Sequence, residues 1–131
     1  MTSSPRLLLT ESDTFFASFA TRQLRRVGFE VVHSMHGQES WELLSHEPFD
    51  LLVTELVLPR MDGYQLVEAI RAEERLAHLP IVILSRLGTR EDVERCRLHG
   101  IEDYFIKPHH QLDWIAQRLF QRWHSKATSR V

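Results

Sequence analysis

Residues 51–63 read LLVTELVLPRMDG, and this stretch decides the fold. An apolar run of strand length ends in a single carboxylate, Glu55, and Pro59 and Gly63 then force a turn. A strand that is apolar on both faces is typical of a parallel sheet covered by helices. Open sheets of this kind carry their functional sites beyond the carboxyl ends of the strands, so we expect Glu55 to lie in such a site.

The segments on either side of this stretch alternate between strand and helix patterns. The pattern predicts strands at residues 7–9, 29–33, 50–56, 80–84 and 104–106. It predicts helices between Asp13 and Gly28, at 38–45, at 64–74, between Thr89 and Gly100, and at 110–123. The predicted core side of the first helix is Phe16, Phe19, Ala20, Leu24 and Val27. The alternation indicates an α/β fold, in which a parallel sheet has helices on both sides.

Length and composition bound the possible functions. The 131 residues, 43% of them hydrophobic, predict one domain over residues 1–123 and a polar tail or linker over 124–131. The formal charge of −2 gives no argument for direct binding of nucleic acid or of an anionic membrane. Cys96 is the only cysteine, which excludes an internal disulfide, and we expect it in the core. No apolar run is long enough to span a bilayer, so we expect a cytoplasmic protein.

Polar residues stand where four of the predicted strands end. They are Thr10, Glu11, Ser12 and Asp13 after the first strand, Glu55 after the third, Ser85 after the fourth and Lys107 after the fifth. Because the carboxyl ends of parallel strands meet at one edge of a sheet, these side chains are expected to converge there. Two interpretations stay open at this point: a functional site, or polar residues that merely cap solvated strand ends.

Three segments carry a resemblance to a known family. Residues 36–44 read HGQESWELL, residues 56–63 read LVLPRMDG, and residues 103–108 read DYFIKP. In this order and spacing, they resemble the receiver domain of bacterial two-component response regulators over residues 6–123. The resemblance implies a flavodoxin-like (βα)5 three-layer sandwich, whose five-stranded parallel sheet has the order 2-1-3-4-5.

The resemblance also implies a role for each strand-end residue. In a competent receiver, two acids after the first strand and an acceptor aspartate hold Mg²⁺ while a histidine kinase donates a phosphoryl group. In this chain the acceptor position is Glu55, the acidic-pocket positions are Glu11, Ser12 and Asp13, and the hydroxyl, switch aromatic and lysine are Ser85, Tyr104 and Lys107. The peptide before Pro108 is expected to be cis.

The departures from the family pattern argue against phosphorylation. Glu55 is one methylene longer than aspartate, and about 1 Å of misplacement can cost on the order of a hundredfold in rate. Ser12 removes a metal-binding charge, so we expect Mg²⁺ binding to be weak or absent and no other metal or cofactor. Arg86 is expected to fill the phosphoryl site and pair with Glu55. A conventional Mg²⁺-dependent phosphoacceptor and a small phosphoryl-transfer hydrolase remain as alternatives to this non-enzymatic role.

Two meanings of Glu55 stay open. In the first, its carboxylate imitates a phosphoryl group, binds Ser85 and Lys107, and holds Tyr104 inward. A carboxylate carries one charge and a phosphoryl group nearly two, so the imitation is incomplete. In the second, Glu55 pairs with Lys107 or Arg86 and the domain is a locked scaffold without a switch.

The expected function is protein–protein interaction in bacterial signal transduction. The resemblance implies a partner face on the fourth helix, fifth strand and fifth helix, with Arg95, His99, Tyr104 and Trp114. Its partners would be signalling proteins, a fused output domain or a second copy of the chain. For Trp114, helix phase leaves two alternatives open, an exposed aromatic anchor or a ring packed on the sheet.

Overall fold

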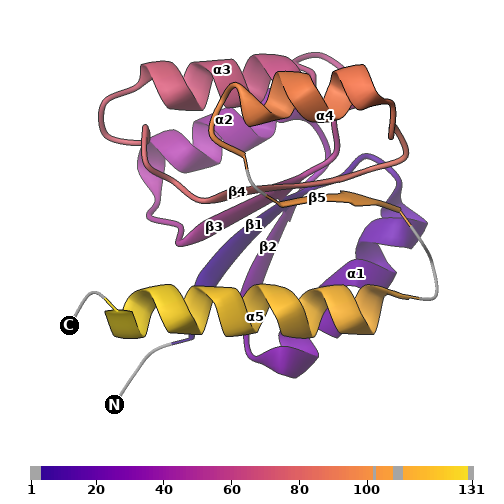
Figure 1. Cartoon of the computed structure of the whole chain (residues 1–131), viewed down its shortest axis with the longest axis vertical. Helices are drawn as coiled ribbons and strands as arrows, with labels where there is room; N and C mark the ends of the chain where they lie inside the picture. Colours follow the sequence, from indigo (N-terminus) through magenta and orange to yellow (C-terminus); the bar gives the residue numbers. More distant parts are fainter. Residues whose placement is uncertain (1–3, 102, 108–110, 130–131) are drawn as a thin grey trace.

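The computed structural model describes residues 4–101, 103–107 and 111–129, with side chains as far as residue 125. Within these residues, strands and helices alternate (Figure 1). The strands are β1 (Arg6–Thr10), β2 (Glu30–Ser34), β3 (Leu51–Thr54), β4 (Ile81–Ser85) and β5 (Asp103–Ile106). The helices are α1 (Thr14–Val27), α2 (Gly37–His46), α3 (Gly63–Ala72), α4 (Arg90–Arg97) and α5 (Leu112–Ser129).

The five strands pair in parallel in the order β2-β1-β3-β4-β5. Leu8 of β1 lies opposite Val32 of β2 on one side and opposite Leu52 of β3 on the other. From β1 the chain goes to β2 at one edge of the sheet, and it then returns to add β3, β4 and β5 on the other side. The switch point of the strand order therefore lies between β1 and β3, the strand that leads to Glu55. This order confirms the predicted flavodoxin-like sandwich.

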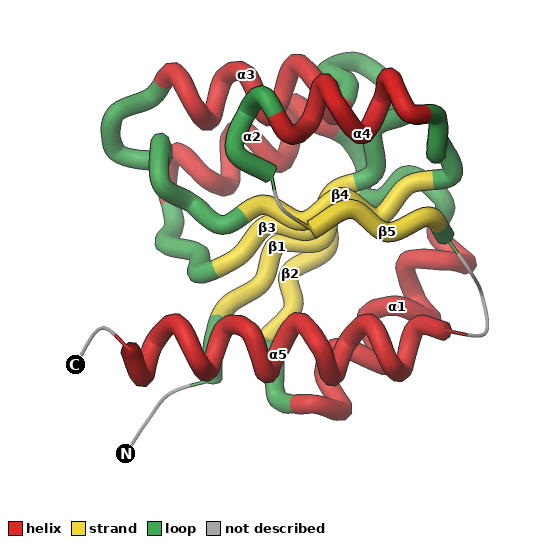
Figure 2. Tube along the Cα trace, viewed as in Figure 1, coloured by secondary structure: helices red, strands yellow, loops and turns green. Residues whose placement is uncertain are grey.

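Alternate residues of the central strands face two separate cores. Leu7 and Leu9 of β1 pack with Val53 of β3 against α1 and α5, whereas Leu8 and Leu52 pack against α2, α3 and α4. Figure 2 shows the sheet between these two groups of helices. Because successive strand residues point to opposite faces and helices cover both, the central strands are apolar at nearly every position.

Helix α1 departs from the prediction at one position. Asp13 is its N-cap, since its Oδ1 accepts the N–H of Phe16 at 3.1 Å. Phe16, Ala20 and Leu24 are buried as predicted, but Phe19 is 38% exposed. The expectation that Phe19 belongs to the core was wrong, because it lies at the edge of the stripe that the other three residues form.

Two predicted boundaries were also wrong. Strand β3 ends at Thr54 and not at residue 56, because the chain turns there and the Gly63 N–H closes the turn on the Leu56 carbonyl at 2.9 Å. Helix α5 continues to Ser129, beyond the predicted end at residue 123. The predicted polar tail contains neither Gly nor Pro, so nothing in its sequence ends the helix. None of the described helices is long and apolar enough to cross a membrane.

Asp62 caps α3 directly after the loop that carries Glu55. Its Oδ1 accepts the Gln65 N–H at 2.8 Å, and the Gln65 Oε1 accepts the Asp62 N–H at 3.0 Å, which is a complete capping box. We expect Asp62→Ala to lower the free energy of unfolding by about 1 kcal/mol, whereas Asp62→Asn, which still caps, changes it little. Urea unfolding measures both; equal losses would contradict the role of the cap.

Candidate functional site

The candidate site lies at the edge of the sheet where β1, β3, β4 and β5 end. Glu11 follows β1, Glu55 follows β3, Ser85 is the last residue of β4, and Lys107 follows β5. The structure brings all four side chains together, as the parallel topology predicts. Glu11, Glu55 and Ser85 are buried, with 2%, 2% and 0% of their surface exposed.

Lys107 joins the two buried carboxylates. Its Nζ lies 2.6 Å from the Glu11 Oε1 and 2.9 Å from the Glu55 Oε2. It also lies 4.6 Å from the centre of the Phe16 ring, which places a cation against an aromatic face. One ammonium group therefore faces two carboxylates, and the buried cluster of Glu11, Glu55 and Lys107 carries a net charge of −1 when all three are ionised.

Four further donors surround the Glu55 carboxylate. The Ser85 hydroxyl donates to Oε1, which also accepts the N–H groups of Leu56 at 2.7 Å and Val57 at 3.2 Å. The Oε2 accepts the Arg86 N–H at 3.2 Å. Both carboxylate oxygens are thus occupied by donors from this chain, in addition to Lys107.

This environment holds Glu55 and Lys107 in their charged forms. Burial by itself raises the pKa of Glu55, but hydrogen bonds from Ser85, Lys107 and the Val57 N–H outweigh it, and the pKa lies below its ordinary value. Burial likewise lowers the pKa of Lys107, but Glu11 and Glu55 outweigh it, and that pKa is raised. The ion pair therefore persists through neutral pH.

Arg86 does not enter the site in the way that was predicted. Its side chain is exposed, and no ion pair joins its guanidinium to Glu55 among the described residues. Only its backbone N–H reaches the carboxylate. The predicted Arg86–Glu55 pair was wrong because the chain leaves β4 with this residue directed outward.

The acidic-pocket positions offer few free oxygen ligands for a metal ion. Asp13 is exposed, its Oδ1 caps α1, and its N–H donates to the Glu11 Oε2 at 3.0 Å. Ser12 has no charge, and the second oxygen of Glu11 is bound to Lys107. No group of three or more His, Cys, Asp or Glu side chains suited to a metal lies among the described residues. These donors do not fit Mg²⁺, which prefers several free oxygen ligands.

A chain of hydrogen bonds connects Glu55 to Tyr104. The Ser85 Oγ, which donates to Glu55, accepts the Leu87 N–H at 3.0 Å. The Leu87 carbonyl in turn accepts the Tyr104 hydroxyl at 2.6 Å. The half-buried ring packs against the core beneath α4, and burial raises the pKa of Tyr104 to about 12. Sequence reasoning missed Leu87, because it contributes backbone atoms that any residue would supply.

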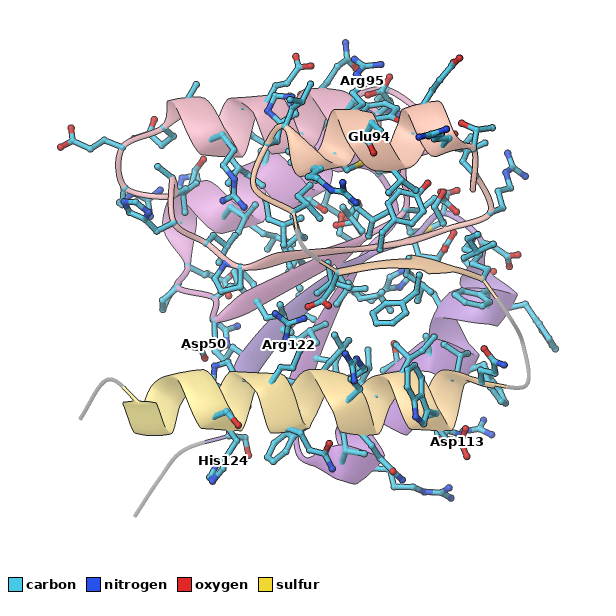
Figure 3. The ribbon with its side chains drawn as sticks, in the orientation of Figure 1. Asp50, Glu94, Arg95, Asp113, Arg122 and His124 are labelled. Atoms are coloured by element: carbon cyan, nitrogen blue, oxygen red, sulfur yellow. The ribbon has the colours of Figure 1, made fainter. Side chains whose placement is uncertain are left out.

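Of the predicted partner face, Arg95 and Trp114 are exposed, whereas His99 and Tyr104 are half-buried. Arg95 projects from α4 (Figure 3), with its guanidinium 3.8 Å from the centre of the Tyr64 ring. The His99 Nε2 lies 4.0 Å from Glu68. Trp114 is 54% exposed, as predicted for an anchor, yet its ring also meets Phe105 of β5 edge to face at 6.2 Å. The Trp114 ring is therefore both exposed and in contact with the sheet, and its role as a binding anchor stays a prediction.

Two other predicted features have different outcomes. Cys96 is 1% exposed in the core, as predicted, and burial raises the pKa of its thiol to about 11. The predicted cis peptide before Pro108 lies outside the described residues.

Comparisons with known proteins agree on one family. The model of the response regulator receiver domain matches residues 7–119. A chemotaxis protein CheY homolog of Campylobacter jejuni is 30% identical over 105 residues, which cover 79% of this chain and 81% of the relative. A probable transcriptional regulator of Porphyra purpurea, ycf29, is 31% identical over 80% of this chain and 50% of its own length. The chain spans half or less of the length of several such curated relatives.

A solved structure extends the likeness. The receiver domain of the sensor histidine kinase PA1611 from Pseudomonas aeruginosa has a TM-score of 0.80 and 28% sequence identity. The match covers 92% of this chain and 98% of that domain, whose structure has a magnesium ion coordinated in the active site cleft.

Proposed function

Because this chain belongs to the response regulator receiver family of two-component signalling, we propose that it works without phosphorylation, as a protein–protein interaction module. In this proposal Glu55 replaces the phospho-accepting aspartate and holds the domain in one conformation. The chain is not an enzyme in this proposal. Its partners are signalling proteins or a fused output domain, and it acts in the cytoplasm, which a single reduced cysteine suits.

One observation carries the proposal: the Glu55 carboxylate already binds the Ser85 hydroxyl and the Lys107 ammonium. The resemblance assigns these two groups to a phosphoryl group on the acceptor. With both groups and three backbone N–H donors on its oxygens, the Glu55 carboxylate is occupied within the chain, which argues against its attack on a phosphorus atom. The same occupancy argues against the phosphoryl hydrolase, which would need a free carboxylate as nucleophile.

The metal requirement points in the same direction. Phosphoryl transfer depends on a cation that neutralises charge on the transferred group. Here Lys107 supplies a cation, but the position after Glu11 is Ser12, and Asp13 is used as a helix cap. We therefore propose that Mg²⁺ does not support phosphorylation at this site.

The first test is chemical phosphorylation. We expect no phosphoryl adduct by intact-mass spectrometry after incubation with acetyl phosphate and MgCl₂. As a matched control, the double variant Ser12→Asp/Glu55→Asp restores the shorter acceptor and a second pocket acid, and we expect a Mg²⁺-dependent adduct. A phosphoryl group on Glu55 of the native chain would overturn the proposal.

A second test separates the phosphoryl imitation from the locked scaffold. The hydrogen-bond chain from Glu55 through Ser85 and Leu87 to Tyr104 supports the imitation. If it holds, Glu55→Ala releases Tyr104 and abolishes partner binding, whereas Glu55→Asp retains part of it. A pull-down from the native cell, with both variants beside the wild type, makes the comparison. Retention of the same partner by a folded Glu55→Ala variant would favour the scaffold.

The proposed docking surface is the face formed by α4, β5 and α5. It presents Trp114 of α5 and Ile106 of β5, which are 54% and 53% exposed, whereas the guanidinium of Arg95 on α4 lies over the Tyr64 ring of α3. Exposed aromatic and arginine side chains are typical binding hot spots. A homodimer through this face is one form of the proposal, and Trp114→Ala should weaken either association.

A further inference from the structure

A cavity lies at the end of the sheet opposite Glu55. It measures about 440 Å³ and opens where β3, β4 and β5 begin, between the connections α3–β4 and α4–β5 and the second half of α5. This volume lies within the range of small-molecule sites. Neither the family likeness nor the site around Glu55 gives this cavity a role.

Apolar and polar groups share the walls of the cavity about equally. Leu79, Ile81 and Leu119 line it from the core, and Trp123 contributes an aromatic side chain from α5. His78 and His99 stand on the two connecting loops at its border. An organic body of the size of one or two fused rings can therefore be buried against aliphatic and aromatic groups.

Arg71 supplies a positive charge that no carboxylate neutralises in the part of the chain that the structure describes. Its Nε donates to the His99 carbonyl at 2.8 Å, and its Nη1 donates to the carbonyls of Ala77 at 3.0 Å and Leu79 at 2.8 Å. Among the described residues, no carboxylate pairs with this half-buried guanidinium, and its Nη2 makes no hydrogen bond. Burial lowers the pKa of Arg71, with no acid to oppose the effect.

The other charges at the cavity offset each other. Arg122 extends from α5 toward the sheet (Figure 3) and forms an ion pair with Asp103 at the start of β5. With the histidines neutral, the lining consequently has one net positive charge, that of Arg71. Three carbonyls hold its guanidinium rigidly, so little side-chain entropy is lost when an anion binds to the remaining N–H groups.

We propose that this cavity binds a small organic anion, whose carboxylate or phosphate head contacts Arg71 and whose apolar body lies against Trp123 and Leu119. Hydrogen bonds between a guanidinium and an oxyanion are among the strongest in proteins, and they would neutralise the lone cation. Such a ligand would connect the loops before β4 and β5 to α5, the helix that carries Trp114.

The test is a titration of the full chain followed by its amide NMR resonances, with naphthoate, naphthyl phosphate, naphthamide and inorganic phosphate as probes. We expect naphthoate or naphthyl phosphate to shift the amide resonances of residues 77–79, 81–82 and 99–100. Whichever anion binds more tightly identifies the head group. We expect neutral naphthamide to bind about tenfold more weakly or worse, because it lacks the charge. Equal affinity for naphthamide, or for inorganic phosphate alone, would overturn the proposal.

Two pairs of variants locate the site. Trp123→Ala removes the aromatic wall and should weaken naphthoate binding several-fold, whereas Trp114→Ala, on the same helix but outside the cavity, should leave it unchanged. Arg71→Lys retains a cation but loses the planar fork and should weaken binding about tenfold. Its fold is checked by the amide spectrum, and if Arg71→Lys fails to fold, the Trp123 and Trp114 pair still decides. Equal effects of those two substitutions would contradict the assignment.

Discussion

Replacement of Lys107 by methionine is expected to lower the free energy of unfolding by about 3–5 kcal/mol at neutral pH. Lys107 is the shared partner of Glu11 and Glu55, which are each 2% exposed. Without the ammonium group, two buried carboxylates remain within one cluster and neither has a counter-charge. Methionine preserves most of the side-chain volume, so the loss measures the charge and not a cavity.

The loss should depend on pH in a defined direction. In the native chain the pKa of Glu55 is lowered, so its stabilising contribution is present above the unfolded value of about 4.3 and is lost as the pH falls through the folded value. In Lys107→Met we expect the pKa of Glu55 to rise, because a buried carboxyl group without a nearby cation favours its protonated form. The deficit relative to the wild type should therefore be largest at neutral pH and shrink toward pH ~4.5.

Urea unfolding at several pH values measures this prediction. Arg97→Met is the matched control, because Arg97 pairs with Glu94 at 3.4 Å on an exposed helix surface and should contribute less than about 1 kcal/mol. In Lys107→Met/Glu55→Gln, removal of one buried charge should restore part of the loss. A cost for Lys107→Met as small as that for Arg97→Met would contradict the buried ion-pair cluster.

Gly37→Ala is expected to destabilise the domain by about 3 kcal/mol, although helix propensity alone would favour alanine by about 1 kcal/mol. Gly37 is the first residue of α2, and a Cβ there would lie 1.9 Å from the carbonyl oxygen of Met61 and 2.8 Å from its carbonyl carbon. Both atoms belong to backbone in the loop that follows Glu55. The clash can be relieved only if α2 or this loop moves.

Gly88→Ala is the control for this prediction. A Cβ at Gly88 would meet the Cδ1 of Ile106 at 2.5 Å, but that atom is the end of a flexible, 53% exposed side chain that can rotate away. We expect a change of about 1 kcal/mol or less in the free energy of unfolding. Thermal or urea unfolding compares the two variants. A stabilised Gly37→Ala protein would show that the close approach of α2 to Met61 is not required.

Much of the fold follows from local pattern. Apolar runs such as 51–53 and 81–84 have no polar face, so both sides of each strand must be covered. In a chain with intervening helices, this predicts a parallel sheet between two layers of helices. The errors fell at ends and edges. Phe19 lies at the border of a helical stripe, and α5 lacks any residue that ends a helix after Trp123. At such places tertiary contacts determine whether a residue is buried and where a helix ends, and the local sequence does not predict either one.

The sequence predicted which residues meet at the candidate site, but it did not predict their hydrogen-bond partners. Glu11, Glu55, Ser85 and Lys107 had to meet, because parallel strands end at one edge. The donors that contact each oxygen of the Glu55 carboxylate depend on the direction in which the chain continues after each strand. Arg86 supplies a backbone N–H and turns its guanidinium to solvent, although its residue type suggested an ion pair.

By itself, the sequence determined the class of the fold and the family, because these depend on residue type and order. Only the tertiary structure decided that both oxygens of Glu55 bind donors of this chain, that Asp13 caps α1, and that Leu87 connects Ser85 to Tyr104. The physical reason is the same in each case. Hydrogen bonds are short and directional, and their partners here come from segments far apart in the chain, so packing alone fixes their geometry.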